Sequence, residues 1–196
     1  MALIRFIKRV YNHFFIPHYK RKMISCGKNV GFSPFDSQFT YTNMKVGNDV
    51  HIGYHADMIA TLSKIIIGNH VVFGPHVSIR GGDHRINVVG RYIDSIDNNE
   101  KLPENDQDVV FKGDNWIGMN TTILKGVEIG RGGVIAAGAV VNKSLPPYCI
   151  AGGVPARVLK WRFTIPQILE HEAKLYPIEE RYTREQLEEI FAKYQR

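Results

Sequence analysis

The sequence contains few cysteines and no long apolar run, and these absences exclude several classes of protein. Cys26 and Cys149 are the only cysteines among 196 residues, so there is no disulfide framework and no CxxC pair of the kind that binds zinc. No stretch approaches the roughly 18 uninterrupted apolar residues that a membrane-spanning helix needs. Arg5, Lys8 and Arg9 interrupt the apolar residues near the N-terminus, so we expect no secretory signal peptide. A reducing compartment, the cytoplasm, is therefore the expected location.

Acidic residues are absent from the first 28 positions, and this absence accounts for the formal charge of +6. Residues 1–28 hold seven Lys and Arg side chains, whereas the remaining 168 residues hold 18 basic and 19 acidic ones. Because the charge is confined to one short segment, we expect no nucleic-acid partner. Apolar and aromatic side chains alternate with these cations, as in a helix at a membrane interface. Two interpretations stay open, namely peripheral contact with an anionic membrane or a helix that caps the end of the fold.

An apolar residue recurs at every sixth position through much of the chain. The repeat positions are Ile67, Phe73, Ile79, Phe111, Ile117, Ile123, Ile129, Ile135 and Val141. The residue after several of them is glycine, and the residue two positions before them is small or β-branched in most repeats. A period of six is typical of a parallel β-helix, in which each hexad supplies one short strand and one corner. A β-sandwich with evenly spaced turns is the less favoured alternative.

The repeat divides the chain into three parts. We predict a basic amphipathic extension over residues 1–28, a hexapeptide-repeat β-helix over residues 29–163 and a helical extension over residues 164–196. The polar segment 80–108 interrupts the repeat and is long enough for a functional loop to be expected. Apolar residues at helical spacing after Thr164 predict two short helices, separated by Pro177. The predicted fold class is all-β, with helices confined to the two extensions.

Four short motifs carry a resemblance to a known family. They are GDHRIN at residues 82–87, WIG at 116–118, AAGAVV at 136–141 and GGVPARVLKWRF at 152–163. In combination, these motifs resemble the hexapeptide-repeat acetyltransferases, which include the maltose and galactoside, the xenobiotic and the polysaccharide-cluster O-acetyltransferases. The resemblance implies a left-handed parallel β-helix, a homotrimer with active sites between subunits, and acetyl coenzyme A (acetyl-CoA) as the acetyl donor.

The resemblance also assigns roles to individual residues. It implies that His84 is catalytic, acting as the general base that removes the proton of an acceptor hydroxyl, with direct transfer and no covalent intermediate. Asp83, which would also orient the imidazole, Asn87 and Asp57 are the implied substrate-binding residues. Coenzyme A requires backbone amides and clustered cations, and the implied contacts are Trp116, Met119, Ala137, Asn142, Lys143, Arg157 and Lys160.

Together these features predict an acetyl-CoA-dependent O-acetyltransferase that acts on a sugar or polysaccharide precursor. Three alternatives stay open: an acetyltransferase of antibiotics or amino sugars, a zinc hydratase of the γ-carbonic-anhydrase type, and a non-catalytic β-solenoid scaffold. The hydratase does not explain the PARVLKWRF segment, and a scaffold needs neither this segment nor the long loop. We therefore expect no metal and a small-molecule or glycan acceptor.

Overall fold

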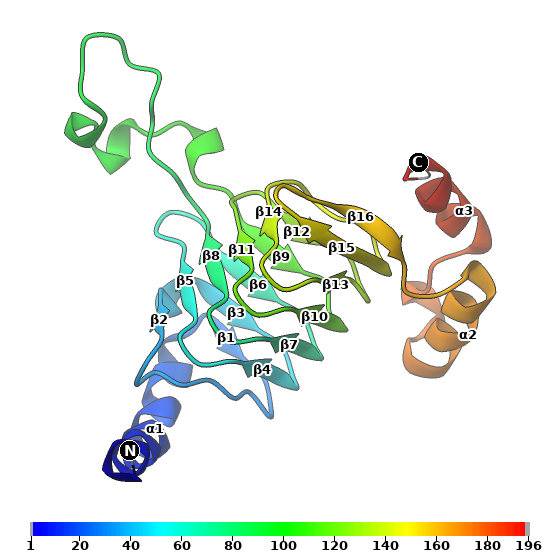
Figure 1. The fold of residues 1–196 in the computed structure, drawn as a ribbon, viewed down its shortest axis with the longest axis horizontal. Helices are drawn as coiled ribbons and strands as arrows, with labels where there is room; N and C mark the ends of the chain where they lie inside the picture. Colours follow the sequence, from blue (N-terminus) through cyan, green and yellow to red (C-terminus); the bar gives the residue numbers. More distant parts are fainter. Residues whose placement is uncertain (1, 195–196) are drawn as a thin grey trace.

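The computed structural model describes residues 2–194 and shows a stack of three-sided coils with helices at both ends (Figure 1). Three sheets form the three faces of the stack. The first contains β1 (Ser25–Cys26), β3 (Met44–Val46), β6 (Ile65–Ile67), β9 (Val109–Phe111) and β12 (Glu128–Ile129). The second contains β4 (Val50–Ile52), β7 (Val71–Phe73), β10 (Asn115–Ile117), β13 (Val134–Ile135), β15 (Cys149–Gly153) and β16 (Ala156–Trp161). The third contains β2 (Gln38–Phe39), β5 (Asp57–Ile59), β8 (Ser78–Arg80), β11 (Thr122–Ile123) and β14 (Val140–Val141).

The six-residue repeat forms the core of this stack, as predicted. All nine repeat positions are at most 3% exposed. Equivalent residues of neighbouring coils lie in register, as Phe73, Ile117 and Ile135 do across β7, β10 and β13. The neighbouring strands are parallel except in the β15–β16 hairpin, which is antiparallel. The prediction of a parallel β-helix is therefore confirmed.

The corners of the coils repeat with the same period as the core. Asp114, Asn120, Gly126, Gly132 and Gly138 are spaced by six and all adopt positive φ, between 50° and 72°. Glycine adopts this left-handed conformation without a steric penalty, and Asn and Asp tolerate it better than most residues. Each hexad therefore encodes its own turn as well as its own core residue.

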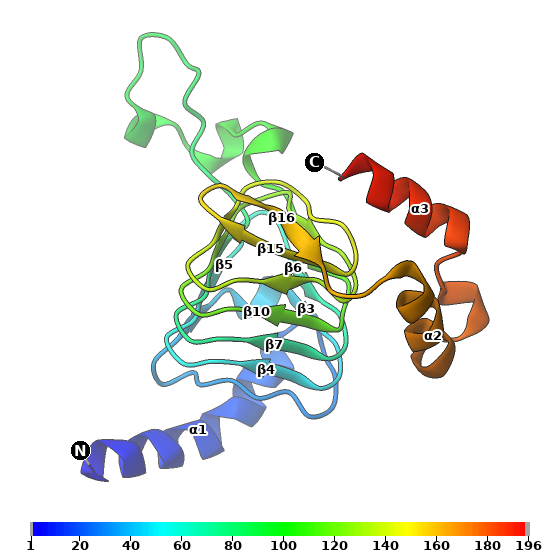
Figure 2. The same ribbon diagram turned by 45° about the vertical axis from the view of Figure 1, so that its right-hand side comes forward.

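Within residues 2–194, three α-helices lie outside the stack, so the predicted class, all-β, is corrected to a β-helix with substantial helical parts. They are α1 (Ala2–Lys22), α2 (Ile165–Leu175) and α3 (Arg184–Lys193). Five 3-10 helices accompany them: η1 (Tyr41–Asn43), η2 (Ile93–Ser95), η3 (Asn98–Glu100), η4 (Pro103–Asn105) and η5 (Ile178–Glu180). Figure 2 shows α1 beneath the first coils and α2 and α3 beside the stack. The break between α2 and α3 contains Pro177, as predicted.

The N-terminal part of the chain passes from helix to stack within a few residues. β1 pairs in parallel with β3, with Ser25 opposite Lys45, so the first strand lies in the segment that was expected to be an extension. Within residues 2–194, none of the helices combines the length and the apolar character that a bilayer-crossing segment requires.

A buried carboxylate joins the C-terminal helices to the stack. Glu172 on α2 has no exposed surface and accepts hydrogen bonds from the Tyr148 hydroxyl (2.8 Å), Arg131 Nη1 (3.2 Å) and the backbone N–H of Tyr182 (2.6 Å). Burial, together with the hydrogen bond to Glu172, raises the pKa of the Tyr148 phenol. Because a buried charge is stable only when it is paired, this cluster determines where α2 lies.

Candidate active site

The polar segment between β8 and β9 forms an arm that projects from the stack (Figure 1). The two ends of the arm are joined by an antiparallel bridge between Gly82 and Asp106 and by a hydrogen bond from Gln107 N to the Gly81 carbonyl (2.9 Å). The Ser63 hydroxyl donates to the same carbonyl (2.7 Å). A Cβ atom at Gly81 would collide with the Ser63 side chain, so the close approach depends on glycine. The base of the arm is therefore held in place by the stack.

His84 lies just inside this bridge, at the edge of an open pocket of about 400 Å³. The pocket is also lined by Ile59, Thr61, Arg80, Gly82, Asp83, Asn98, Lys101 and Asp106. The His84 side chain is exposed, and it makes no hydrogen bond to any residue that the structure describes. The imidazole is therefore open to solvent, so an acceptor hydroxyl could come within hydrogen-bond reach of a ring nitrogen, as general-base catalysis requires.

Asp83 contacts residues other than the neighbouring histidine. Its carboxylate accepts a hydrogen bond from Asn105 Nδ2 (2.9 Å) and forms an ion pair with Lys125 Nζ (2.6 Å). Burial raises the pKa of Asp83, but the hydrogen bonds from Lys125 and Asn105 outweigh burial, so the net shift is downward. Asp83 thus fastens the base of the arm to the β11–β12 corner, rather than orienting the imidazole of His84.

The other two implied substrate residues lie near the His84 pocket but do not line it. Asp57 on β5 forms an ion pair with Arg80 on β8, and Arg80 Nη1 also donates to the Asp57 carbonyl (3.2 Å). Asp57 Oδ1 is buried and has no partner among residues 2–194. Asn87 is exposed on the arm, where its Oδ1 accepts a hydrogen bond from Arg85 Nε (3.2 Å). Asp57 therefore has an unpartnered carboxylate oxygen close to the pocket, but this oxygen is buried.

The residues implied in coenzyme binding fall into two groups. The first group lies on the second sheet and at the corner that leads from it to the third sheet: Trp116 on β10 is 59% exposed, and Met119 at the corner is 47% exposed. Ala137 occupies the equivalent corner of the next coil, and a Cβ atom at Gly118 would collide with its backbone. Met119 and Ala137 are therefore both exposed at this corner, on neighbouring coils.

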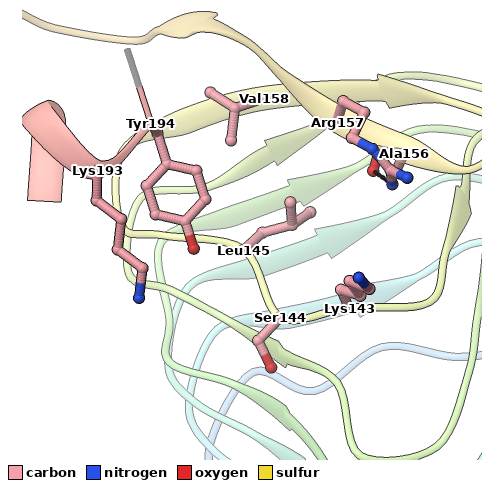
Figure 3. Close-up of a pocket in the computed structure, with 8 residues that line it drawn as sticks. All are labelled: Lys143, Ser144, Leu145, Ala156, Arg157, Val158, Lys193 and Tyr194. Atoms are coloured by element: carbon pink, nitrogen blue, oxygen red, sulfur yellow. Dashed lines mark hydrogen bonds between the residues drawn. The ribbon is translucent and has the colours of Figure 1, made fainter. Parts of the chain in front are cut away.

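The second group lies at the last coil, around a pocket of about 330 Å³ (Figure 3). Its lining residues are Lys143, Ser144, Leu145, Ala156, Arg157, Val158, Lys193 and Tyr194. We call this cavity the end pocket. Three of the lining side chains are cationic, and among the described residues that line it none is acidic. Asn142 and Lys160 are exposed near it but do not line it.

Lys193 and Tyr194, at the end of α3, were not identified from the sequence. Trp161 on β16 stacks on Phe191 of α3, with ring centroids 3.8 Å apart and planes at 6°, and Tyr194 meets Trp161 edge-on at 6.4 Å. Figure 3 shows the Tyr194 ring over the pocket, with Lys143 and Arg157 on the other side from Lys193. The only signal in the sequence was the helical spacing that includes Phe191, and this spacing does not show where the helix docks.

The described part of the chain, residues 2–194, contains no group of three or more His, Cys, Asp or Glu side chains placed to hold a metal ion.

The His84 pocket and the end pocket share no lining residue. Arg162 donates to Asp114 (2.8 Å) and to the Gly132 carbonyl (3.3 Å), so it acts within the stack. A single chain therefore displays the implied site residues in separate places.

Comparison with known proteins adds independent information. Residues 108–143 match the family model described as bacterial transferase hexapeptide (six repeats). A probable macrolide acetyltransferase of Lysinibacillus sphaericus is 36% identical over 128 residues, which cover 60% of this chain and 70% of that protein. A galactoside O-acetyltransferase of Lactococcus lactis is 30% identical over 140 residues, which cover 70% of this chain but only 63% of that protein.

The solved structure of a hexapeptide-repeat-containing acetyltransferase from Vibrio cholerae, complexed with acetyl-CoA, has the same fold. Its TM-score is 0.64 at 26% identity, and the match covers 74% of this chain and 75% of that chain. The chain spans 63%, 58% and 54% of the length of three of the curated relatives it matches.

Proposed function

This chain belongs to the hexapeptide-repeat acetyltransferase family, and we propose that it transfers an acetyl group from acetyl-CoA to a hydroxyl of a sugar or polysaccharide precursor. The observation that carries the proposal is the position of His84. Its imidazole stands at the fixed base of the arm, exposed, at the edge of a polar pocket. Imidazole is the side chain best suited to proton transfer near neutral pH.

The proposed reaction is a direct transfer in which His84 handles one proton. A nitrogen of the His84 imidazole removes the proton from the acceptor hydroxyl as its oxygen attacks the thioester carbonyl carbon. The C–S bond then breaks, and the departing thiolate of coenzyme A takes the proton back from the imidazolium. Asp57 would bind a neighbouring hydroxyl of the acceptor through its carboxylate after a shift of its partner Arg80 exposes the buried Oδ1. Asp83 would act indirectly, because it holds the arm to Lys125.

The end pocket suits the phosphorylated, adenine-bearing end of coenzyme A. Lys143, Arg157 and Lys193 would bind phosphate oxygens, since cations are strong partners for phosphate groups. Leu145 and Tyr194 supply an apolar floor and an aromatic face for the adenine ring. Met119 and Ala137 would contact the pantetheine arm through their backbone amides, with Trp116 beside it. Asn142 and Lys160 would bind coenzyme A at the rim of the end pocket.

A homotrimer of left-handed coils would bring these separate groups together between subunits. Support for a subunit contact comes from the outer face of the second sheet. Val72 and Trp116 lie side by side on β7 and β10 and are 45% and 59% exposed. Adjacent large apolar side chains on a sheet surface are typical of an interface. We also place the enzyme in the cytoplasm, because Cys26 and Cys149 are both free thiols, with residues 1–28 as the segment available for peripheral membrane contact.

The proposal is tested by measuring thiol release from acetyl-CoA with the purified full chain and a panel of sugars, nucleotide sugars and antibiotics. We expect the His84→Ala variant to lose about 100- to 10,000-fold in kcat, which is the usual contribution of a general base. His70→Ala is the matched control, because His70 is an exposed histidine at a different corner.

Each outcome has a defined meaning. Undiminished turnover by the His84→Ala variant overturns the role of His84. Failure of acetyl-CoA to bind the wild-type chain overturns the function as a whole. Turnover with antibiotics alone would replace the sugar acceptor by the second candidate function, which the 36% identity to the probable macrolide acetyltransferase favours.

A further inference from the structure

One face of α1 is fixed to the first coils of the stack. Lys8 forms an ion pair with the Asp36 carboxylate, and Asn12 Nδ2 donates to Ser33 Oγ (2.9 Å). Tyr19 stacks on an aromatic ring of η1 with the centroids 4.4 Å apart. Together with Ile16, which packs against the core, these residues recur every three or four positions and form one stripe of the helix. We call it the anchoring stripe.

A second stripe of α1 consists of large apolar side chains that face solvent. Leu3, Ile7, Val10 and Phe14 are spaced by four, three and four residues and are 70%, 46%, 39% and 70% exposed. Phe6, which is 65% exposed, lies beside them. At about 100° per residue, this apolar stripe lies about 165° from the anchoring stripe. The apolar stripe therefore points away from the stack. Figure 2 shows that the N-terminal part of α1 projects beyond the stack.

This orientation argues against α1 acting only as a cap. A helix that merely covers the open end of a solenoid buries its apolar side against the exposed strands. Here Ile16 and Tyr19 do so, and Tyr11 meets the Phe35 ring edge-on at 5.5 Å, but the apolar stripe does not. Five large apolar side chains gathered on one exposed face are far more than isolated surface residues and indicate a docking surface.

The charge of the helix identifies the occupant of this surface. Arg5, Arg9, Lys20, Arg21 and Lys22 lie on α1 with Lys8, and the helix contains no acidic residue. Within the described chain, the only ion pair made by α1 is that of Lys8. An anionic bilayer offers what such a helix needs, namely an apolar layer for the stripe and phosphates for the cations. A groove on a partner protein would need both an apolar floor for the stripe and acidic side chains placed to pair with the cations.

We propose that α1 lies in the interface of an anionic phospholipid bilayer, with the apolar stripe inserted among the headgroups and acyl chains. The anchoring stripe then faces the aqueous side and keeps the stack against the membrane surface. This inference concerns α1 alone and does not depend on the acetyltransferase function.

The test is flotation of the full chain with vesicles of pure phosphatidylcholine and with vesicles that also contain phosphatidylglycerol. We expect binding to the anionic vesicles, at least about tenfold weaker binding to the neutral ones, and weakening by salt. A variant with Ile7→Gln, Val10→Gln and Phe14→Gln is expected to bind at least about tenfold more weakly, and glutamine preserves helix propensity. Arg5→Gln with Arg9→Gln is expected to weaken binding to anionic vesicles specifically.

The matched control replaces exposed apolar residues elsewhere, Leu62→Gln and Ile178→Gln, which are 56% and 78% exposed in the wild-type chain. It should bind as the wild type does. Equal binding by the apolar-stripe variant, or no binding of the wild type to anionic vesicles, overturns the proposal. A smaller assembly of the apolar-stripe variant than of the wild type in sedimentation also overturns the proposal, because the stripe would then contact a second copy of the chain. No readout involves turnover, so these outcomes are independent of the enzymatic test.

Discussion

Glu172 is the residue on which the position of the C-terminal helices depends. We expect Glu172→Ala to lower the free energy of unfolding by about 1–3 kcal/mol, because the buried Tyr148 hydroxyl would lose its acceptor, while Arg131 would keep its contact with the Glu180 carbonyl. Chemical denaturation measures this change. The control is Glu170→Ala on the same helix, whose carboxylate pairs with Lys174 at the surface and should leave stability unchanged. Equal stability of the two variants would contradict the structural role of Glu172.

Cys149 shows how burial controls thiol chemistry in this protein. Burial raises the pKa of its thiol from 9.0 to about 12. Since the thiolate is the reactive form, we expect iodoacetamide at pH 8 to label Cys149 only after unfolding, as measured by mass spectrometry. The unfolded thiol ionises from about pH 9 while the folded one stays protonated, so this group makes the fold less stable as pH rises toward 12. Rapid labelling of Cys149 in the folded chain would contradict the prediction.

At the residue scale, the sequence revealed the core but not the polar contacts. Each hexad repeats one local choice of apolar residue, so burial of positions such as Ile117 follows from spacing alone. The partner of Asp83 is Lys125, on a different coil, and this pairing depends on how the coils stack. The proximity of Asp83 and His84 in the sequence therefore did not predict that Asp83 contacts Lys125 and Asn105.

At the scale of elements, the docking of α3 places Lys193 and Tyr194 beside the end pocket, which we propose to bind coenzyme A. If it completes the end pocket, the double variant Lys193→Ala and Tyr194→Ala should raise the KM for acetyl-CoA about tenfold and leave kcat unchanged, since hydrogen bonds to charged groups contribute about 1.5–3 kcal/mol. Steady-state kinetics provides the measurement. The control on the same helix is Arg184→Ala, which lies far from the pocket and pairs only with Glu188. An unchanged KM for acetyl-CoA in the double variant would show that α3 does not contribute to coenzyme binding.

The extent of the helices could be predicted, whereas their placement could not. Helical spacing and Pro177 located α2 and α3 along the chain. Their docking depends on Glu172 and on the Trp161–Phe191 stack, which join residues far apart in sequence. The same holds for α1, where the cations were evident but the outward direction of the apolar stripe required the structure.

At the scale of the whole molecule, the separation of the two pockets predicts complementation between subunits. The His84→Ala chain should be nearly inactive alone, and the Arg157→Ala chain should be only weakly active when acetyl-CoA is kept well below its KM, because Arg157 would contribute to coenzyme binding. After mixing by joint refolding, about a quarter of the sites in random oligomers would pair a native His84 with a native Arg157 from another subunit. Thiol release should therefore recover to about a quarter of the wild-type rate. No recovery above the separate variants would show that each site is built within one subunit.

The bridge between Gly82 and Asp106 has a consequence for how such a protein can diversify. The strands before and after the arm remain neighbours of unbroken sheets, since β6 pairs directly with β9 and β8 with β11. Residues 85–104 could thus vary in length and composition while every coil keeps its register, whereas Asp83, His84 and Asn105 lie at the fixed base of the arm. Mutations in the arm would then change the preferred acceptor without affecting the stability of the β-helix.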